Sequence, residues 1–218
     1  MKKIFFLFLI FFKIYTFAQT GFVSNINTRL KHIHAEVGDN VEVKSTEILN
    51  YDASNFIKKI TEQTIVLNDF DFKILDNKSS ILSDKKKREY LKGFCERNNI
   101  SKLIILYRNP FINQYSPYGN LYRLKFDFGI LTQERKKNVI YYMNRMILSY
   151  YDPKTDTLLP IVLPGEDSLY EEYSKQKFNE NVVDKNSKKL INSSDVEKDF
   201  IEKFERRFKK NFDEVMKR

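Results

Sequence analysis

Apolar residues follow helical spacing in three parts of this chain. They recur every three or four positions in residues 54–66, and again in a segment that begins at Ser83 or Asp84 and ends at Arg97. From Ser194 the same spacing continues to the C-terminus, with acidic residues in the first turn and basic residues in the last turns. The pattern therefore predicts three helices, of which the last is the longest.

One side of the C-terminal helix is a stripe of phenylalanines. Its members recur at every fourth residue: Phe200, Phe204, Phe208 and Phe212. Docking of this stripe onto a sheet is its simplest use, and the alternative is a helix that binds a partner or a second copy of the chain, which makes the four residues a candidate partner site. A helix lying on a membrane is a third alternative, but acidic and basic residues nearly cancel along it, which disfavours an anionic bilayer.

Strand patterns lie on both sides of the second helix. Apolar and polar residues alternate in residues 70–74, as in a half-buried strand. Residues 102–107 are apolar throughout after Lys102, as in a strand covered on both faces. Residues 70–107 together therefore predict a βαβ unit. A hairpin is predicted from residues 28–37 and 41–49, which a Gly-Asp-Asn turn connects.

The second half of the chain predicts antiparallel strands. Residues 124–130 alternate, residues 139–151 form one long strand, and Asp152-Pro153 starts a turn after which residues 157–163 pair back. These segments predict a three-stranded antiparallel meander. The fold class is therefore α+β: a mixed sheet from one or two βα units, then the meander, then the long C-terminal amphipathic helix.

The same patterns divide the chain into four parts. Residues 1–18 are a predicted signal peptide, and residues 19–164 form one α+β domain. Residues 165–193 are a polar connector with a short helix near 167–177, and residues 194–218 are the amphipathic helix. The chain that remains after cleavage is long enough for one sizeable hydrophobic core.

The first 18 residues carry the parts of an export signal. Lys2 and Lys3 provide a positive start, an apolar run follows, and Ala18 offers a small residue before Gln19. The run is short for a membrane span and is interrupted by Lys13. We therefore expect cleavage after Ala18, a periplasmic or secreted protein, and no transmembrane segment after cleavage. A retained N-terminal anchor is the alternative.

Charge and cysteine content narrow the expected partners. The formal net charge is +9, with 38 basic and 29 acidic residues, and this mixture favours an ordinary solvated surface. For an exported protein we expect no nucleic-acid partner. Cys95 is the single cysteine, which excludes an intrachain disulfide and a zinc site of several thiolates. Its place on the inner side of a helix predicts a buried, inert thiol.

An aromatic segment between two predicted strands is the preferred binding site. Residues 109–120 form a twelve-residue connection, a length that is often functional within a compact sheet. We expect it to recognise a peptide, glycan or protein through Phe111, Ile112, Tyr115 and Tyr118. The alternative is an ordered flap that packs over the edge of the sheet.

His32 and His34 are the only histidines, and they share one face of a predicted strand with Glu36. With Glu36, the two histidines form a possible set of three metal ligands, but coincidental surface residues are the simpler interpretation. No Gly-x-Ser-x-Gly motif, no His-Glu-x-x-His motif and no glycine-rich phosphate-binding loop is present, and only six glycines are available for glycine-rich turns. We therefore predict no catalytic residue, no metal and no cofactor.

The order of helices, buried strand and meander, with Asp152 to Thr155 in the last hairpin turn, resembles small bacterial envelope domains. These are the N-terminal part of the Tol-Pal propeller protein and the curli-secretion lipoprotein, and the signal peptide resembles those of Bacteroidota envelope proteins. The resemblance is architectural, covers about residues 41–163 and carries no catalytic residues. The chain also has no lipid-anchor cysteine. What the resemblance implies is protein–protein interaction in the envelope.

We therefore expect a non-catalytic binding or interaction module of the cell envelope, whose partner is an unknown envelope protein or glycan. Two alternatives belong to other functional classes. One is a secreted hydrolase with carboxylate or His/metal chemistry. The other is a structural envelope protein that self-associates as a homo-oligomer.

Overall fold

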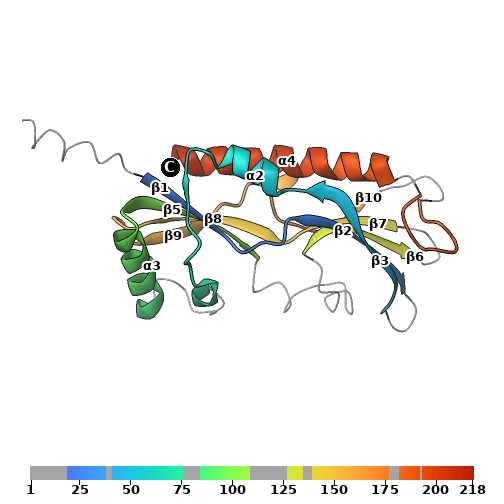
Figure 1. The fold of residues 1–218 in the computed structure, drawn as a ribbon, viewed down its shortest axis with the longest axis horizontal. Helices are drawn as coiled ribbons and strands as arrows, with labels where there is room; N and C mark the ends of the chain where they lie inside the picture. Colours follow the sequence, from blue (N-terminus) through green and yellow to red (C-terminus); the bar gives the residue numbers. More distant parts are fainter. Residues whose placement is uncertain are drawn as a thin grey trace, which may run out of the picture.

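The protein has an α+β fold in which two mixed sheets lie end to end beneath one long helix (Figure 1). The computed structural model describes residues 19–37, 41–75, 84–108, 127–134, 139–176, 182–191 and 193–218. The predicted fold class is confirmed. The expected single sheet, however, is replaced by two five-stranded sheets, which we name sheet A and sheet B.

Sheet A has the strand order β4-β1-β5-β8-β9. Its strands are β1 (Gln19–Ser24), β4 (Ile65–Val66), β5 (Ile100–Arg108), β8 (Met146–Asp152) and β9 (Thr157–Pro160). β1 pairs in parallel with both β4 and β5, and the β5–β8 and β8–β9 pairs are antiparallel. The apolar run predicted at 102–107 is the buried centre of β5. The predicted turn after Asp152 connects β8 to β9.

Sheet B has the strand order β10-β7-β6-β2-β3. Its strands are β2 (Arg29–Val37), β3 (Val41–Asp52), β6 (Phe128–Glu134), β7 (Val139–Asn144) and β10 (Glu171–Gln176). β2 pairs in parallel with β6, and all other neighbours are antiparallel. The predicted hairpin at 28–37 and 41–49 is therefore confirmed as β2–β3. The short helix predicted near 167–177 is wrong, because this segment adds strand β10 to the edge of the sheet.

The helices are α2 (Ser54–Ile60), α3 (Lys85–Arg97) and α4 (Ser193–Lys217), with short 3₁₀ turns η1 (Phe72–Leu75) and η4 (Gly165–Asp167). The Asp84 carboxylate accepts a hydrogen bond from the Lys87 N–H at the start of α3, as its position predicts. The first predicted helix is shorter than expected and ends where the Thr61 hydroxyl donates to the Ile57 carbonyl.

The strand predicted at residues 70–74 is wrong, and so is the βαβ unit built on it. η1 occupies this segment, because the Asp71 carboxylate accepts the Lys73 N–H and turns the chain. The Phe70 ring packs edge-on against Phe94 of α3, with ring centroids 5.1 Å apart. The strand that pairs in parallel with β5 is instead β1, which comes from the N-terminal segment.

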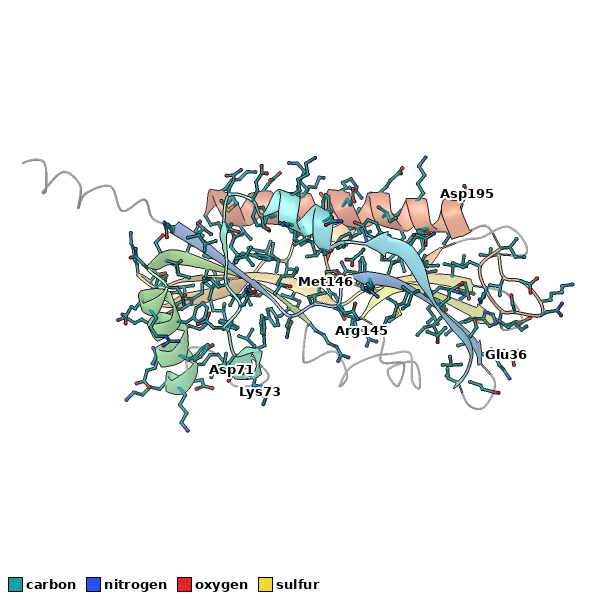
Figure 2. All side chains as sticks on the ribbon, in the orientation of Figure 1. Glu36, Asp71, Lys73, Arg145, Met146 and Asp195 are labelled. Carbon is teal, nitrogen blue, oxygen red and sulfur yellow. The ribbon has the colours of Figure 1, made fainter. Side chains whose placement is uncertain are left out.

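The long strand predicted at residues 139–151 is also wrong, because the chain changes sheet at Arg145. β7 ends at Asn144 and β8 begins at Met146, so the predicted meander is divided between the two sheets. The Asn144 side chain accepts the Met146 N–H, and the Arg145 N–H donates to the Asp127 carbonyl. We call this crossing point the seam; Figure 2 labels Arg145 and Met146 there.

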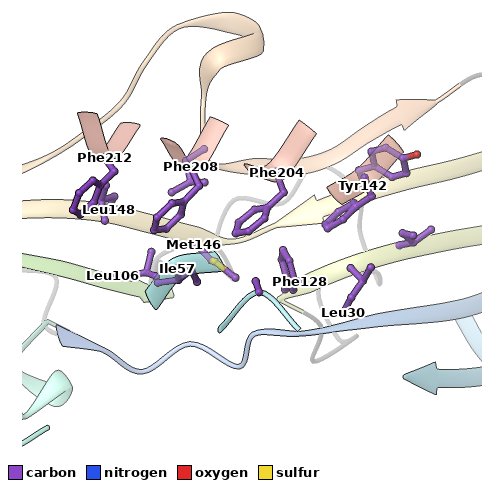
Figure 3. Packing of buried hydrophobic residues seen from close by; sticks show 14 of the residues in the cluster. Leu30, Ile57, Leu106, Phe128, Tyr142, Met146, Leu148, Phe204, Phe208 and Phe212 are labelled. Carbon is purple, nitrogen blue, oxygen red and sulfur yellow. The ribbon is translucent and has the colours of Figure 1, made fainter. Parts of the chain in front are cut away.

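The largest hydrophobic cluster lies between α4 and both sheets (Figure 3). The four phenylalanines of the α4 stripe are all buried, each with 3% or less of its surface exposed. Phe200 and Phe204 pack against Phe128 of β6, and Phe204 and Phe208 pack against Phe56 of α2. The stripe is thus used for docking within the chain, and the rings proposed as a partner site are not accessible while α4 lies on the sheets.

A second hydrophobic cluster joins α3 to the opposite face of sheet A. Cys95 belongs to it and is 1% exposed, which confirms that the thiol is buried. Burial raises the pKa of the Cys95 thiol to about 12, so the reactive thiolate does not form at neutral pH. We conclude that this cysteine contributes to packing.

Candidate functional site

A cluster of polar side chains lies at the outer end of sheet B, where Figure 2 labels Glu36. Alternation along β2 places His32, His34 and Glu36 on one face of the sheet. In the parallel β2–β6 pair, His34 is in register with Thr132, and Glu36 with Glu134. Glu47 of β3 and Lys188 of a neighbouring turn complete the group, which we call the polar cluster.

Both histidines are buried, so their interpretation as coincidental surface residues is wrong. His32 has no exposed surface, and His34 is 3% exposed. Two strands and the 182–191 turn cover them: the Leu190 N–H donates to Glu47, and the Ser45 hydroxyl donates to the Lys188 carbonyl. A buried imidazole requires polar partners for its ring nitrogens, and every ring nitrogen of these two histidines has a polar oxygen within 3.3 Å.

The two rings are part of one hydrogen-bonded chain between two carboxylates. The His32 Nδ1 lies 2.7 Å from Glu47 Oε1, and its Nε2 lies 2.7 Å from Thr132 Oγ1. The same Thr132 oxygen lies 2.9 Å from His34 Nδ1, and His34 Nε2 lies 3.3 Å from Glu134 Oε2. Four contacts therefore connect Glu47 to Glu134 through two imidazoles and a hydroxyl.

The hydrogens in this chain do not suffice for all four contacts when both imidazoles are neutral. A neutral imidazole and a hydroxyl each donate one hydrogen, whereas a carboxylate only accepts. Glu47 accepts from His32 Nδ1 and Thr132 then donates to His32 Nε2, which leaves one His34 hydrogen for two contacts. We assign this hydrogen to the contact with Thr132, because the contact between His34 Nε2 and Glu134 is the longest of the four. In this tautomer the His34 Nε2 lone pair faces the Glu134 carboxylate.

A lysine ammonium lies beside the contact that lacks a hydrogen. The Lys188 Nζ is 2.6 Å from Glu134 Oε2 and 3.8 Å from Glu36 Oε1. The Asp184 carboxylate holds the turn that carries this lysine by accepting the N–H groups of Asn186 and Ser187. Lys188 itself has a φ of 57°, a left-handed conformation that is uncommon for a residue with a side chain. The turn therefore places a cation at the partly exposed end of the polar cluster.

Burial makes this group sensitive to acid. Desolvation lowers the pKa of His32 and of His34 below the ordinary 6.5, and it outweighs the opposing effects of Glu47 and Glu134. The Lys188 ammonium lowers the pKa of Glu134. At neutral pH both imidazoles are therefore uncharged, as the hydrogen count assumes.

We expect the metal-free protein to lose stability as the pH falls below 6.5. The unfolded histidines take up protons near that pH and the folded ones only at lower pH, so the free energy of unfolding decreases until the lowered pKa values are reached. Denaturant unfolding in a chelating buffer at about pH 7.5 and about pH 5.5 measures this change. His32→Gln should reduce it, and an equal change in this variant would contradict the assignment.

The aromatic binding segment at 109–120 lies entirely outside the described residues, and with it Phe111, Ile112, Tyr115 and Tyr118. The structure does place the two ends of the connection, at the seam between the sheets. Arg108 ends β5 and Asp127 precedes β6, and the Arg108 Nε lies 2.8 Å from Asp127 Oδ1. The fully buried Arg145 is nearby, with its Nη1 3.9 Å from the same oxygen.

Sequence analysis found only part of the polar cluster. The alternation of His32, His34 and Glu36 was visible, but Thr132, Glu134 and Lys188 are about 100 to 150 positions away. No local spacing connects them to β2. The parallel β2–β6 pairing brings the first two into the site, and the turn before α4 brings the third.

Comparisons with known proteins yield no relative: no protein family, curated protein or solved structure matches the chain. The geometry must therefore be interpreted from its own chemistry. Among the helices within the described ranges, none combines the length and apolarity that a membrane span requires.

Proposed function

We propose that the protein is an exported, non-catalytic binding module of the cell envelope, and that residues 109–120, within the connection 109–126, are its recognition segment. Phe111, Ile112, Tyr115 and Tyr118 are the proposed contact residues within this segment. The observation that supports the proposal is the position of the segment's two ends, which meet at the seam.

The connection is far longer than its end points require. Eighteen residues separate Arg108 from Asp127, although the side chains of these two residues form an ion pair of 2.8 Å. A few residues would suffice to join strand ends that lie so close together. Long connections with adjacent ends form Ω-loops and binding loops in other proteins, and their length is then related to function.

The two strands that precede and follow the segment can hold its ends rigidly. β5 is the central strand of sheet A and β6 is the central strand of sheet B, so the connection leaves and re-enters the best-supported strand of each sheet. Binding residues are commonly carried on loops that a rigid framework positions.

A photo-crosslinking amino acid at Tyr115 or Tyr118 is expected to give a discrete adduct in the intact envelope of the native host. The reason is that these rings are proposed to contact the partner directly, and aromatic side chains dominate such contacts. Gel mobility measures the adduct, and its sensitivity to protease or to cell-wall hydrolases distinguishes a protein partner from a glycan.

The control is the same amino acid at Val162, which is 75% exposed and lies outside the proposed segment. This position should give no adduct of the same size. An identical product from Val162, or none from either tyrosine position, would argue against a recognition segment at 109–120.

A further inference from the structure

Three potential metal ligands come together at the partly exposed end of the polar cluster. One ligand atom each from His34, Glu36 and Glu134 lies within 4.8 Å of the others. His34 and Glu36 are two residues apart on β2, and Glu134 is in register with Glu36 on the paired strand β6. Regular strands fix such ligands more precisely than loops do. We propose that these three residues bind Zn²⁺, and that Lys188 occupies the position of the metal ion when the site is empty.

The orientation of His34 distinguishes this site from a group of surface carboxylates. In the assigned tautomer its Nδ1–H donates to Thr132, 2.9 Å away, and this leaves the Nε2 lone pair directed at Glu134. A metal-binding histidine shows the same arrangement, with one ring nitrogen bound to an outer oxygen and the other on the metal. The ring is 3% exposed, so packing holds it in this orientation.

The 3.3 Å contact between His34 Nε2 and Glu134 Oε2 fits two ligands of one zinc ion. Ligands bound at the usual 2.0–2.1 Å in a tetrahedral arrangement lie ~3.3 Å apart. A zinc ion would also supply the positive charge that this pair of acceptors lacks. The same contact without a cation places a lone pair against a carboxylate, which costs free energy.

Lys188 behaves as a substitute cation. Its Nζ contacts Glu134 at 2.6 Å and approaches Glu36 at 3.8 Å, so it bridges two of the three ligands. Lys44 contacts the other oxygen of Glu36, at 3.1 Å. The Lys188 side chain is 22% exposed and can turn toward solvent when a divalent ion displaces it. Zinc binding must therefore compete with this ammonium group.

The ligand set favours zinc over the alkaline-earth ions. One imidazole and two carboxylates suit Zn²⁺, whereas Mg²⁺ and Ca²⁺ prefer oxygen ligands alone. The carboxylates are about two-fifths exposed, so an ion can enter from solvent and keep a water as its fourth ligand. None of the three ligands belongs to the proposed recognition segment, so the metal site can be correct whether or not that segment binds a partner.

The test is titration of the full-length mature chain, purified without a histidine tag and freed of metal, with Zn²⁺ followed by calorimetry. We expect one zinc ion per chain and no competition from millimolar Mg²⁺ or Ca²⁺. Co²⁺ should give the visible spectrum of a four-coordinate site. Glu36→Gln should abolish binding, and because Glu36 is partly exposed this variant is expected to fold.

Three further variants distinguish residues that affect zinc binding from a nearby residue that does not. Lys188→Met should tighten zinc binding, because the competing ammonium is removed. Thr132→Val should weaken it about 10- to 100-fold, the usual effect of losing an outer-shell partner. Glu42→Gln is the matched control, since Glu42 also pairs with Lys44 but is not one of the three ligands, and it should leave the affinity unchanged.

Each contrary result overturns the proposal. Absence of zinc binding by the unmodified chain does so, whatever the Lys188 variant shows. Binding that survives both Glu36→Gln and His34→Gln would place the ion elsewhere. Equal affinity for Mg²⁺ or Ca²⁺ would show that carboxylates alone attract the ion and that His34 is not a ligand.

Discussion

Deletion of residues 195–218 is expected to abolish the cooperative unfolding transition. The deletion removes one side of the main hydrophobic cluster, including four phenylalanines that are each 3% exposed or less. Burial of one such ring contributes about 1.5–3 kcal/mol, so the four together are comparable to the whole stability of a typical domain. A denaturant titration followed by circular dichroism should show no sigmoidal transition in the truncated chain.

A single substitution makes the same prediction quantitative. Phe208 is fully buried between Phe204, Phe212 and Phe56, and Phe208→Ala should lower the free energy of unfolding by about 3–5 kcal/mol. Lys209→Ala on the exposed side of the same helix should have little effect. An unchanged midpoint in both the truncated chain and Phe208→Ala would mean that α4 is a docking element with no part in the core.

Polar contacts fix the register of α4 as well as its attachment. The Tyr142 hydroxyl donates to Asp199 over 2.8 Å, and the Tyr51 hydroxyl donates to Glu205 over 2.9 Å. Near the other end of the helix, the Asn211 amide donates to the Asp167 carbonyl. These bonds connect α4 to β7 and to the edge strand β3 of sheet B, and to η4. The helix is therefore bound along most of its 25 residues.

The elements that the sequence predicted well are those whose signals are local. α3 has helical spacing and an Asp84 cap, α4 has a four-residue phenylalanine repeat, and β5 has an unbroken apolar run. Each signal lies within the element that it defines, so no knowledge of the rest of the fold is required. The β2–β3 hairpin belongs to the same class, because its turn residues lie between its strands.

The elements that were missed depend on contacts between distant parts of the chain. Residues 139–151 have strand character throughout, and only the Arg145 N–H bond to the Asp127 carbonyl shows where the strand divides. The separation into two sheets arises there. Similarly, alternation could place His32 and His34 on one face, but it could not show that Thr132 connects them. Pairing between strands about 100 residues apart is invisible to local periodicity.

Asp127→Asn is expected to be the most damaging substitution at the seam, with a loss of about 2–3 kcal/mol in the free energy of unfolding. The Asp127 carboxylate lies 2.8 Å from Arg108 and 3.9 Å from Arg145, which is fully buried. The amide preserves the shape and the backbone bond to Arg145, so the variant isolates the charge. Denaturant unfolding at constant pH measures the loss.

Asp167→Asn provides a matched control, because it changes an aspartate of similar exposure that also pairs with two cations, Arg206 and Lys210. Those partners are exposed on α4, so solvent screens them and the loss should be a small fraction of that for Asp127→Asn. Equal losses in the two variants would show that the burial of Arg145 is not decisive.

Removal of a second charge at the seam tests the cause directly. Without the Asp127 carboxylate, Arg108 and Arg145 each lose one acidic partner, and the Arg145 side chain is out of contact with solvent. Combining Asp127→Asn with Arg108→Gln should therefore recover part of the stability lost in the single variant, a non-additive result typical of groups in contact. Strict additivity would instead assign the loss to packing. Recovery would establish that the two sheets are joined at a point where charge balance, and not hydrophobic area, decides stability.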